Sequence, residues 1–411
     1  MAIQISFDQG FVEGEVTVPL SKSESNRILL IKALAGFDFK DDIFSDSGDT
    51  RSLLKGIMHE GAVIHAGEGA ATAKFLMAYF AFTCKDVVIT GSEGLLKRPM
   101  QDTVDLLIEL GADIRYEDKE NFLPVRIYAV PLKPKSFLFC NGKRSSQHIS
   151  AAMMLAPLLG TELTIEITGE ALSSYPYIEL TASIMQKFGA DVKLQGNKVT
   201  IGNTPYTHSN CVSGGDWSAA SYFYEIAALS QRSEIRIKNI DTESMQGDKK
   251  IASIMNLFGV VTTKQDSAIL LTKKQPTTLP YFTDDFIHTP DIALTVAATC
   301  SGLNVKADLQ GLKNLVIKES DRVSCFQREA YKLNVKTDFC DFSKLKILET
   351  THLQHTSRIL KTYNDHRIAM CLAPLSVIVR EITLDHPEVV NKSFPLYWEN
   401  LERLGFKISM A

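Results

Sequence analysis

Hydrophobic and polar residues alternate in some stretches of the chain and recur with helical spacing in others. Alternation over residues 12–18 and 234–237 predicts strands with one exposed face. Apolar runs at 28–35, 149–159 and 292–299 predict helices, and the last two are apolar almost all round, which is typical of buried helices. Buried helices with half-exposed strands favour an α/β fold that has its helices inside and its sheets outside. A doubly wound Rossmann fold would instead need continuous apolar strands and a G-x-G-x-x-G turn, which the chain lacks.

A second pattern recurs six times along the chain. An amphipathic helix ends in a Gly or Asn, and a β-rich stretch follows. The turn residues are Gly61, Gly111, Gly189, Gly259, Asn334 and Gly405. Gly or Asn in such a place predicts the left-handed residue that ends a helix. The spacing of 50 to 78 residues is too long for the common solenoid repeats, and it suits two pseudo-symmetric domains of three units each.

Length and composition narrow the class of protein. A chain of 411 residues is too long for one core, so two domains are expected, and 45% apolar with 22% charged residues is ordinary for a globular protein. The net charge of −4 argues against nucleic acid as the main partner. Seven scattered cysteines without a C-x-x-C pair predict reduced thiols in a cytoplasm. We expect neither a signal peptide nor a transmembrane helix.

Polar and basic residues gather at one predicted helix start, residues 21–27. Ser21 and Glu24 form a capping box, and Lys22 and Arg27 add two cations. Unpaired backbone N–H groups and the positive end of the helix dipole make this position suitable for a phosphate or a carboxylate. An ordinary solvated helix start is the alternative explanation.

Similar clusters precede other predicted helices. They are residues 97–101, 141–147, 173–177, 289–291, 318–322 and 363–367, with Lys392 as a further cation near a turn. In each cluster an anion site competes with a simple cap or an exposed salt-bridged turn. Asp291 either caps a helix or accepts a proton from a substrate hydroxyl. Lys318 and Arg322 are expected on one helix face, where two cations repel each other unless an anion binds there.

Two further sets of residues suggest no chemistry. Residues 244–248 indicate a tight turn before a helix. His352 and His355 are three residues apart but have no matching third ligand nearby, so no metal site is expected.

In this order along the chain, the clusters resemble the enolpyruvyl transferase family, and within it the 5-enolpyruvylshikimate-3-phosphate synthases. The matching stretches are 21–27, 98–99, 145–147, 174–177, 244–248, 290–291, 318–322 and 363–367, which together span the whole chain. The resemblance implies two inverse α/β domains of three repeats each, with helices inside, sheets outside and an active site in the interdomain cleft. One domain would comprise residues 1–19 plus 216–411, and the other residues 20–215.

The implied reaction transfers the enolpyruvyl group of phosphoenolpyruvate to the 5-hydroxyl of shikimate 3-phosphate and releases phosphate. It belongs to the shikimate pathway, which leads to chorismate and the aromatic amino acids. The resemblance implies no metal and no organic cofactor. We therefore expect a cytoplasmic monomer whose partners are these two small molecules, and neither nucleic acid nor a membrane.

The resemblance also assigns residues to roles. Proton transfer falls to Asp291 and Glu319, assisted by Lys22 and His366. The residues implied to bind shikimate 3-phosphate are Lys22, Ser23, Arg27, Ser145, Ser146, Gln147, Ser174, Tyr177, Asp291, Asn314 and Lys318. Those implied to bind phosphoenolpyruvate are Lys22, Arg98, Gln147, Arg322, Arg367 and Lys392.

The chain departs from the family pattern at two places. Residues 68–74 read Glu-Gly-Ala-Ala-Thr-Ala-Lys where the family has a loop of the type Asn-Ala-Gly-Thr-Ala-x-Arg, and Tyr175 replaces a usual basic residue. Two other functions therefore stay open. One is an enolpyruvyl transferase with another acceptor alcohol, such as the UDP-N-acetylglucosamine of the sister enzyme. The other is an inactive relative that binds phosphorylated ligands, although all the implied proton-transfer residues are present.

Overall fold

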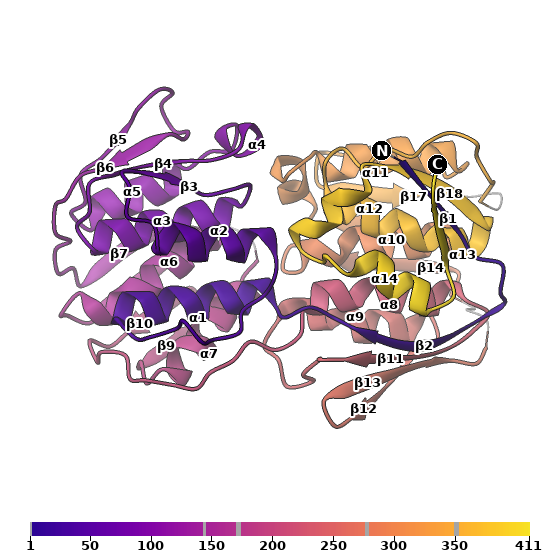
Figure 1. The fold of residues 1–411 in the computed structure, drawn as a ribbon, viewed down its shortest axis with the longest axis horizontal. Helices are drawn as coiled ribbons and strands as arrows, with labels where there is room; N and C mark the ends of the chain where they lie inside the picture. The colour runs from indigo at the N-terminus through magenta and orange to yellow at the C-terminus, as the bar shows by residue number, and fades with distance from the viewer. Residues whose placement is uncertain (1, 143–144, 170–173, 276–278, 349–352) are drawn as a thin grey trace. The chain divides into compact units, whose positions relative to one another are not determined.

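The computed structural model describes residues 2–142, 145–169, 174–275, 279–348 and 353–411. Lys143, Arg144, Ser173 and His352, which belong to the sequence clusters above, lie outside these ranges. The chain divides into two compact units, Met1–Leu20 with Gly214–Ala411 (unit 1) and Ser21–Ser213 (unit 2). Both units mix helices and strands, so the predicted α/β class is confirmed (Figure 1).

Unit 2 holds two four-stranded sheets, in the orders β3-β4-β6-β5 and β7-β8-β10-β9. Its strands are β3 (Val63–His65), β4 (Val87–Thr90), β5 (Ile114–Tyr116), β6 (Val125–Ile127), β7 (Phe137–Asn141), β8 (Leu163–Thr168), β9 (Val192–Gln195) and β10 (Lys198–Ile201). Its helices are α1 (Lys22–Ala35), α2 (Gly48–Ile57), α3 (Ala70–Phe82), α4 (Glu93–Leu96), α5 (Gln101–Glu109), α6 (Gln147–Leu155), η1 (Ala156–Leu158) and α7 (Pro176–Lys187).

Unit 1 holds three sheets, in the orders β12-β13-β11-β2, β14-β15-β17-β16 and β18-β1-β19. Its strands are β1 (Ala2–Ser6), β2 (Phe11–Thr17), β11 (Arg232–Lys238), β12 (Val261–Gln265), β13 (Ala268–Lys273), β14 (Tyr281–Asp285), β15 (Lys306–Gln310), β16 (Thr337–Cys340), β17 (Lys344–Ile347), β18 (Glu381–Asp385) and β19 (Lys407–Met410). Its helices are α8 (Trp217–Leu229), η2 (Gly247–Lys249), α9 (Lys250–Leu257), η3 (Pro290–Ile292), α10 (Ala293–Gly302), η4 (Lys313–Ile317), α11 (Arg322–Lys332), α12 (His366–Leu372), η5 (Ala373–Leu375), α13 (Ser376–Val379), η6 (Pro387–Lys392) and α14 (Tyr397–Arg403).

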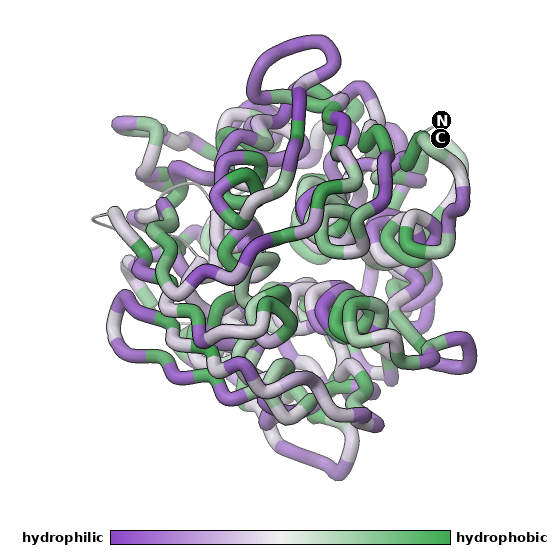
Figure 2. The backbone as a smooth tube through the Cα atoms, turned by 90° about the vertical axis from the view of Figure 1, so that its left-hand side faces the viewer, coloured by the Kyte–Doolittle hydropathy of each residue, from purple (hydrophilic) through white to green (hydrophobic). Residues whose placement is uncertain are grey.

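The four-stranded sheets share one construction. In each sheet the two strands at one edge are parallel, such as β7 and β8. The two strands at the other edge form an antiparallel hairpin, such as β9 and β10. Residues along β11 alternate strictly between exposed and buried, so one face of its sheet packs on the core while the other is exposed. In the view of Figure 2 many projecting loop segments are hydrophilic, whereas helical turns carry many of the hydrophobic positions.

Helices form the inner layer of each unit. In unit 2 the sheets lie around the group of α1, α3 and α6 (Figure 1). Every residue of α6 after Gln147 is buried, and so is every residue of α10 except Gly302. The predicted burial of these two helices is confirmed. No described helix combines the length and the apolar character that a membrane crossing requires.

The predicted start and end of the first helix are confirmed. The Ser21 hydroxyl accepts the N–H of Glu24 at 3.3 Å, and Gly36 ends α1 with a left-handed φ of 71°. The turn glycines at 111, 189, 259 and 405 have positive φ as expected, and so does Asn334. The same expectation is wrong for Gly61. Helix α2 ends at Ile57 with Met58 as its cap, so the chain has already left the helix when it reaches Gly61.

The predicted unit of a helix followed by a strand occurs three times in each half of the described chain. These pairs are α2–β3, α5–β5 and α7–β9 in unit 2, and α9–β12, α11–β16 and α14–β19 in unit 1. The sheets that the described residues form are unequal in number, with two in unit 2 and three in unit 1.

Candidate active site

The start of α1 brings several predicted residues of unit 2 together around Arg27. The Arg27 guanidinium donates to the Thr181 hydroxyl at 2.7 Å, to the Ser23 carbonyl at 2.9 Å and to the Gln147 side chain at 3.2 Å. It also lies 5.5 Å from the ring centre of Tyr177. These contacts join residues from α1, α6 and α7, so they fix the relative positions of three helix starts.

Arg27 is a buried cation whose hydrogen-bond acceptors among the described residues are neutral groups. Only 1% of the residue is exposed, and burial lowers the pKa of its guanidinium to about 10. It therefore stays charged at neutral pH among hydroxyl, amide and carbonyl oxygens. A buried positive charge that neutral dipoles solvate attracts an anion strongly.

Lys22 also has a defined partner in unit 2. Its ammonium group lies 3.1 Å from a carboxylate oxygen of Asp49, which belongs to the first turn of α2 and is 7% exposed in its side chain. The Asp49 carboxylate thus orients the first lysine of α1. Sequence patterns did not indicate this pair because its members are 27 positions apart.

The starts of α6 and α7 carry the predicted hydroxyl groups. The Ser145 hydroxyl accepts the N–H of Gln147 at 3.2 Å, so Ser145 serves as a local cap. The Ser146 hydroxyl is buried and has no hydrogen-bond partner among the described residues. Ser174 has a left-handed φ of 57°, and its carbonyl accepts the N–H of Tyr177 where α7 begins. The buried Ser146 hydroxyl therefore has a hydrogen bond to offer to a ligand.

Two other segments of unit 2 that the sequence analysis named, residues 97–101 and 68–74, lie at or near helix starts. Arg98 is half-buried between α4 and α5, and its N–H bonds to the Leu95 carbonyl. Ala70 is the first residue of α3, and Lys74 is buried on the same helix with 6% exposure. Burial, followed by the charge of Lys74, lowers the pKa of His148 to about 3, which leaves that imidazole neutral.

In unit 1 the predicted cations and carboxylates form one network. Arg322, which is 2% exposed, donates to Asp365 at 2.8 Å, to Asp291 at 3.1 Å and to Glu319 at 2.6 Å. Burial acts to lower the pKa of Arg322, but the three carboxylates outweigh burial and raise it. Arg322 is therefore a permanent positive charge at the centre of the network.

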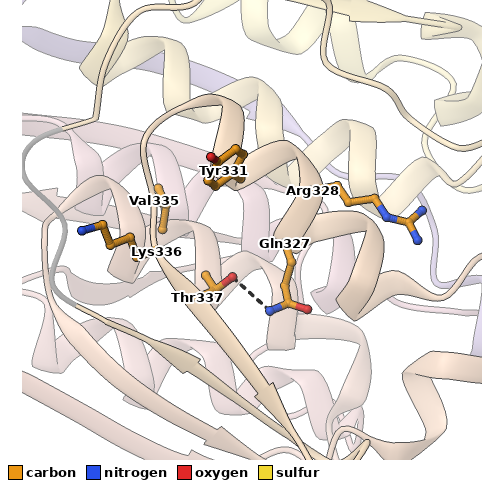
Figure 3. A pocket seen from close by; sticks show the side chains of 6 residues that line it. All are labelled: Gln327, Arg328, Tyr331, Val335, Lys336 and Thr337. Carbon is orange, nitrogen blue, oxygen red and sulfur yellow. Dashed lines mark hydrogen bonds between the residues drawn. The ribbon is translucent and has the colours of Figure 1, made fainter.

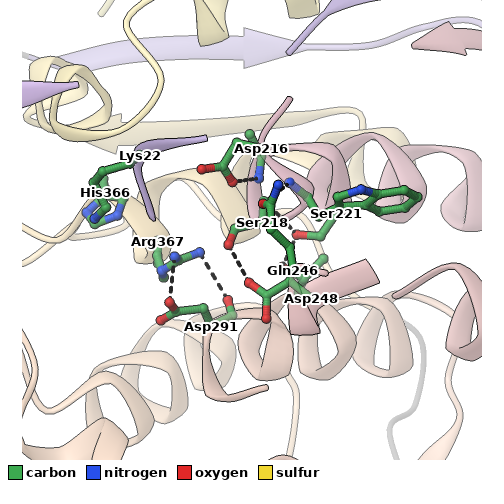
Figure 4. A network of polar contacts seen from close by, with 12 residues as sticks. Lys22, Asp216, Ser218, Ser221, Gln246, Asp248, Asp291, His366 and Arg367 are labelled. Atoms are coloured by element: carbon green, nitrogen blue, oxygen red, sulfur yellow. Dashed lines mark hydrogen bonds and ion pairs between the residues drawn. The ribbon is translucent and has the colours of Figure 1, made fainter. Parts of the chain in front are cut away.

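Two more cations complete this network. Lys392 donates to the Glu319 carboxylate at 2.7 Å, and Arg367 lies 2.9 Å from the Asp291 carboxylate (Figure 4). Each of these carboxylates also contacts Arg322, so each bridges two cations. Three cations and three carboxylates balance. Of the two cations expected to repel each other, Arg322 therefore already has three carboxylates that compensate its charge.

The predicted pairing of Lys318 and Arg322 on one helix face is also wrong. Helix α11 begins only at Arg322, with Asp321 as its N-cap, and Lys318 comes before the helix. Lys318 follows η4 and is half-buried, and Asn314 is buried within η4. Asp291 lies inside η3 and does not cap a helix, since Thr289 and Ile292 occupy the cap positions of η3 and α10.

His366 stands at the first position of α12, beside Arg367. It is 1% exposed, and neither ring nitrogen has a hydrogen-bond partner among the described residues. Burial, with the positive charge of Arg367 next, lowers the pKa of His366 well below its usual value. The imidazole is therefore neutral, and its nitrogens are available for hydrogen bonds with a ligand.

Asp248 is a buried carboxyl that the sequence reading assigned to a plain turn. It accepts a hydrogen bond from the Ser218 hydroxyl (Figure 4). Burial, followed by the negative charge of Asp291, raises the pKa of Asp248 to about 7. A carboxyl that exchanges its proton near neutral pH beside a proposed base is a feature of functional sites.

A separate hollow of about 480 Å³ lies on the later turns of α11, which begins at Arg322, and on the start of β16 (Figure 3). Its lining residues are Gln327, Arg328, Tyr331, Val335, Lys336 and Thr337. None of them belongs to the predicted site. Within the described chain, no group of three or more His, Cys, Asp or Glu side chains is arranged to hold a metal ion.

Comparison with known proteins identifies the family of this chain. Residues 36–401 match the profile of EPSP synthase (3-phosphoshikimate 1-carboxyvinyltransferase). A 3-phosphoshikimate 1-carboxyvinyltransferase of Bacteroides fragilis is 37% identical over 401 residues, which is 97% of each chain. One from Pasteurella multocida is 30% identical, with 96% of each chain covered. The chain belongs to the EPSP synthase family.

Solved structures agree on the fold of this family. An EPSP synthase from Acinetobacter baumannii superposes with a TM-score of 0.78 at 20% identity and covers 100% of both chains. The small four-stranded sheets are therefore those of an EPSP synthase fold. The predicted family and enzyme activity, that of a 3-phosphoshikimate 1-carboxyvinyltransferase of the shikimate pathway, are confirmed by the full-length sequence matches.

The structure adds four acidic residues to the set that the EPSP synthase motifs suggested. Asp49, Asp248, Glu329 and Asp365 are buried acids, each with a defined partner in the contacts that the structure describes. Asp365 stood within a predicted cluster, but its bond to Arg322 joins residues 43 positions apart. Such pairings leave no periodic signal in a single sequence, so burial and contact were needed to find them.

Proposed function

We propose that the chain transfers the enolpyruvyl group of phosphoenolpyruvate to the 5-hydroxyl of shikimate 3-phosphate, with the sequence-assigned residues in their implied roles. The observation that carries this proposal is the network of Arg322, Arg367 and Lys392 with Asp291 and Glu319. Such a network offers cations to substrate anions and carboxylates to proton transfer. It occurs in a chain that matches the family over nearly its whole length.

The two compact units correspond, in our proposal, to the two inverse α/β domains of the family. Unit 2 would supply binding groups for shikimate 3-phosphate around Arg27. The residues of this set are Lys22, Ser23, Arg27, Ser145, Ser146, Gln147, Ser174 and Tyr177. Unit 1 would add Asp291, Asn314 and Lys318 for the same substrate. The buried charge of Arg27 and the unpartnered Ser146 hydroxyl support an anionic, hydroxyl-rich ligand in unit 2.

Phosphoenolpyruvate would bind to the cations Arg322, Arg367 and Lys392 of unit 1. Unit 2 would add the cations of Lys22 and Arg98 and the amide of Gln147. The carboxylate and phosphate of this substrate would compete with Glu319 and Asp291 for Arg322, Arg367 and Lys392. A carboxylate that loses its cation partners binds a proton more readily. Substrate binding would thus prepare Glu319 to donate a proton to the methylene carbon, while Asp291 accepts the proton of the attacking hydroxyl.

The remaining assistance would come from Lys22 and His366. The neutral His366 imidazole can hydrogen-bond a transferring proton or a substrate oxygen without adding charge. The cations would stabilise the phosphate as its bond to the enolpyruvyl carbon breaks, while the methyl group formed by protonation gives a proton back to a carboxylate and so restores the methylene. We also propose a cytoplasmic monomer, and the seven free cysteines are compatible with a reducing compartment.

A phosphate-release assay tests this function. Release should require phosphoenolpyruvate and shikimate 3-phosphate together, and an arm with UDP-N-acetylglucosamine as acceptor should show none. Release with the alternative acceptor alone would assign the chain to the other acceptor class. Absence of release with either acceptor would favour an inactive relative.

A further inference from the structure

The segment that leads into α12 has an unusual backbone. Tyr363 and Asn364 both adopt left-handed conformations, with φ of 54° and 55°. Residues other than glycine rarely occupy this region, and a tyrosine does so less readily than an asparagine. Two such residues in succession persist only when the surrounding structure holds them.

Glu329 of α11 is the side chain that holds this turn. Its carboxylate is fully buried and accepts the Tyr363 hydroxyl at 2.6 Å. The same carboxylate accepts the N–H of Lys361 at 2.8 Å and the ammonium group of Lys332 at 2.6 Å. Burial, followed by this hydrogen bond, raises the pKa of Tyr363 to about 12, so its hydroxyl keeps the proton that it donates.

Neighbouring bonds fix the rest of the segment. The N–H of Thr362 donates to the Asp385 carboxylate of β18 at 2.6 Å. The Thr362 carbonyl in turn accepts the N–H of Asp365 at 2.9 Å, which closes the turn over Tyr363 and Asn364. The backbone is thus held on one side by β18 and on the other by Glu329.

The turn ends at Asp365, which organises the cations of unit 1. Its carboxylate accepts bonds from the Arg322 side chain at 2.8 Å and from the N–H of Arg367 at 3.0 Å. A shift of the turn would move Asp365, and with it the Arg322 guanidinium and the backbone from which the Arg367 side chain projects. The path from Glu329 to the cations is therefore a short series of direct contacts.

We propose that Glu329 is a positioning residue of the active site, because it holds the left-handed turn that places Asp365, Arg322 and Arg367. It acts through Tyr363, and we assign it no contact with substrate. The kinetic consequence rests on the proposed function, whereas the hold on the turn can be measured without substrate.

The test removes the tyrosine hydroxyl alone. Tyr363→Phe keeps the ring but deletes the bond to Glu329, and Tyr331→Phe, an exposed tyrosine on the same helix as Glu329, is the matched control. We expect the KM for phosphoenolpyruvate to rise about tenfold in Tyr363→Phe, which is the scale of one lost bond to a charged group. The KM for shikimate 3-phosphate should stay within about twofold, and Tyr331→Phe should match the wild type.

Two further variants separate positioning from general destabilisation. Glu329→Gln should raise the same KM, and its effect should add less than fully to that of Tyr363→Phe, because the two variants share the Tyr363–Glu329 bond. Asn364→Gly in the Tyr363→Phe background should restore part of the loss, since glycine adopts a left-handed φ without strain. Hydrogen exchange of residues 361–367 should be faster in Tyr363→Phe than in the wild type.

The outcomes are distinct. An unchanged KM for phosphoenolpyruvate in an active Tyr363→Phe enzyme, or additive losses in the double variant, would overturn the proposal. A lower kcat with both KM values unchanged would show a merely structural role. If the wild type releases no phosphate, the proposed function fails, while equal exchange rates at residues 361–367 in both proteins would sink the positioning role by itself.

Discussion

Single residues of the site are charged groups that already have partners within the protein. Glu319 contacts Arg322 and Lys392, and Asp291 contacts Arg322 and Arg367. A buried ion pair recovers little net stability, because both charges lose their hydration. Under the proposed function the arrangement keeps the cations in place, and a substrate anion would replace a carboxylate without burying an uncompensated charge.

This exchange leads to a prediction for Glu319. Glu319→Gln should lower kcat by roughly 100-fold, the usual scale for removing a general acid–base group. The KM for phosphoenolpyruvate should not rise, because the neutral amide competes less with the substrate for Arg322 and Lys392. Steady-state kinetics measure both constants, with the exposed Glu402→Gln as control. A kcat near that of the wild type would make Glu319 a structural residue.

Asp248 allows a prediction about pH and stability. Its pKa rises from the ordinary 3.8 to about 7 in the folded chain, so the folded state holds a proton that the unfolded state releases between these values. The resulting stabilisation is complete below about pH 4 and is lost as the pH rises through about 7. Asp248→Asn does not titrate, so its melting temperature should fall less between about pH 5 and about pH 8 than that of the wild type.

The exposed Asp118→Asn is the control for this comparison. It should follow the wild type at both pH values. The same fall in melting temperature for Asp248→Asn and the wild type would show that the buried carboxyl does not carry the effect.

For helices and strands, the sequence predicted those features that residues close to one another along the chain determine. The Ser21 cap, the Gly36 terminus and the burial of α6 follow from local rules of capping and periodicity. The sequence analysis wrongly placed Lys318 within a helix. The side chain of Asp321 accepts the N–H of Ser324, so α11 starts later than the spacing of charges alone suggested. The capping bond and the spacing of charges indicate different first residues for this helix, and only the structure shows which one is right.

The carboxylate partners were beyond sequence reasoning for a different reason. Asp49 with Lys22, and Asp365 with Arg322, come from different helices, and nothing in the spacing of acidic residues distinguishes them from exposed ones. The family resemblance supplied the proposed substrate-binding residues. It did not supply the surrounding acids that orient them, because these become visible only through burial and distance.

The segment around Gly215 gives an element-scale prediction. The Gly215 carbonyl accepts a bond from the Gln246 side chain, and Gly215 pairs with Leu20 beyond the end of β2. An added Cβ would lie 1.6 Å from the backbone oxygen and 2.7 Å from the carbonyl carbon of Asn239, and these backbone atoms cannot yield as the end of a flexible side chain can. Gly215→Ala should therefore lower the free energy of unfolding by about 3 kcal/mol or more, at or above the upper end for overpacking.

Chemical denaturation measures this loss, and Gly94→Ala is the matched control. The nearest atom to a Cβ at Gly94 is the Ser92 hydroxyl oxygen, 3.9 Å away, and the position lies in the short helix α4. Alanine there should change stability by less than about 1 kcal/mol, in the stabilising direction. Equal effects of the two substitutions would contradict the steric argument.

For the molecule as a whole, the main feature is that each unit has a hydrophobic core of its own. The core of unit 2 is built from buried residues between Ile28 and Tyr206. The core of unit 1 combines residues before Pro19 with residues from Trp217 onward. A continuous segment that encloses its own core meets the physical requirement for independent folding, whereas unit 1 needs both the first strands and the second half of the chain.

We therefore predict that residues 21–213, expressed alone, fold with a single cooperative thermal transition. Because Arg27 and the hydroxyl groups at the starts of α6 and α7 all lie within this segment, shikimate 3-phosphate should raise its melting temperature, since a ligand that binds only the folded state stabilises it. Arg27→Ala in the same fragment should abolish that increase.

The opposite fragment, residues 214–411 without residues 1–20, should not unfold cooperatively, because β2 forms the edge of the β12-β13-β11-β2 sheet and β1 is the central strand of the β18-β1-β19 sheet. Differential scanning calorimetry of both fragments decides the matter, and a fragment 21–213 without a cooperative transition would show that its core depends on the rest of the chain.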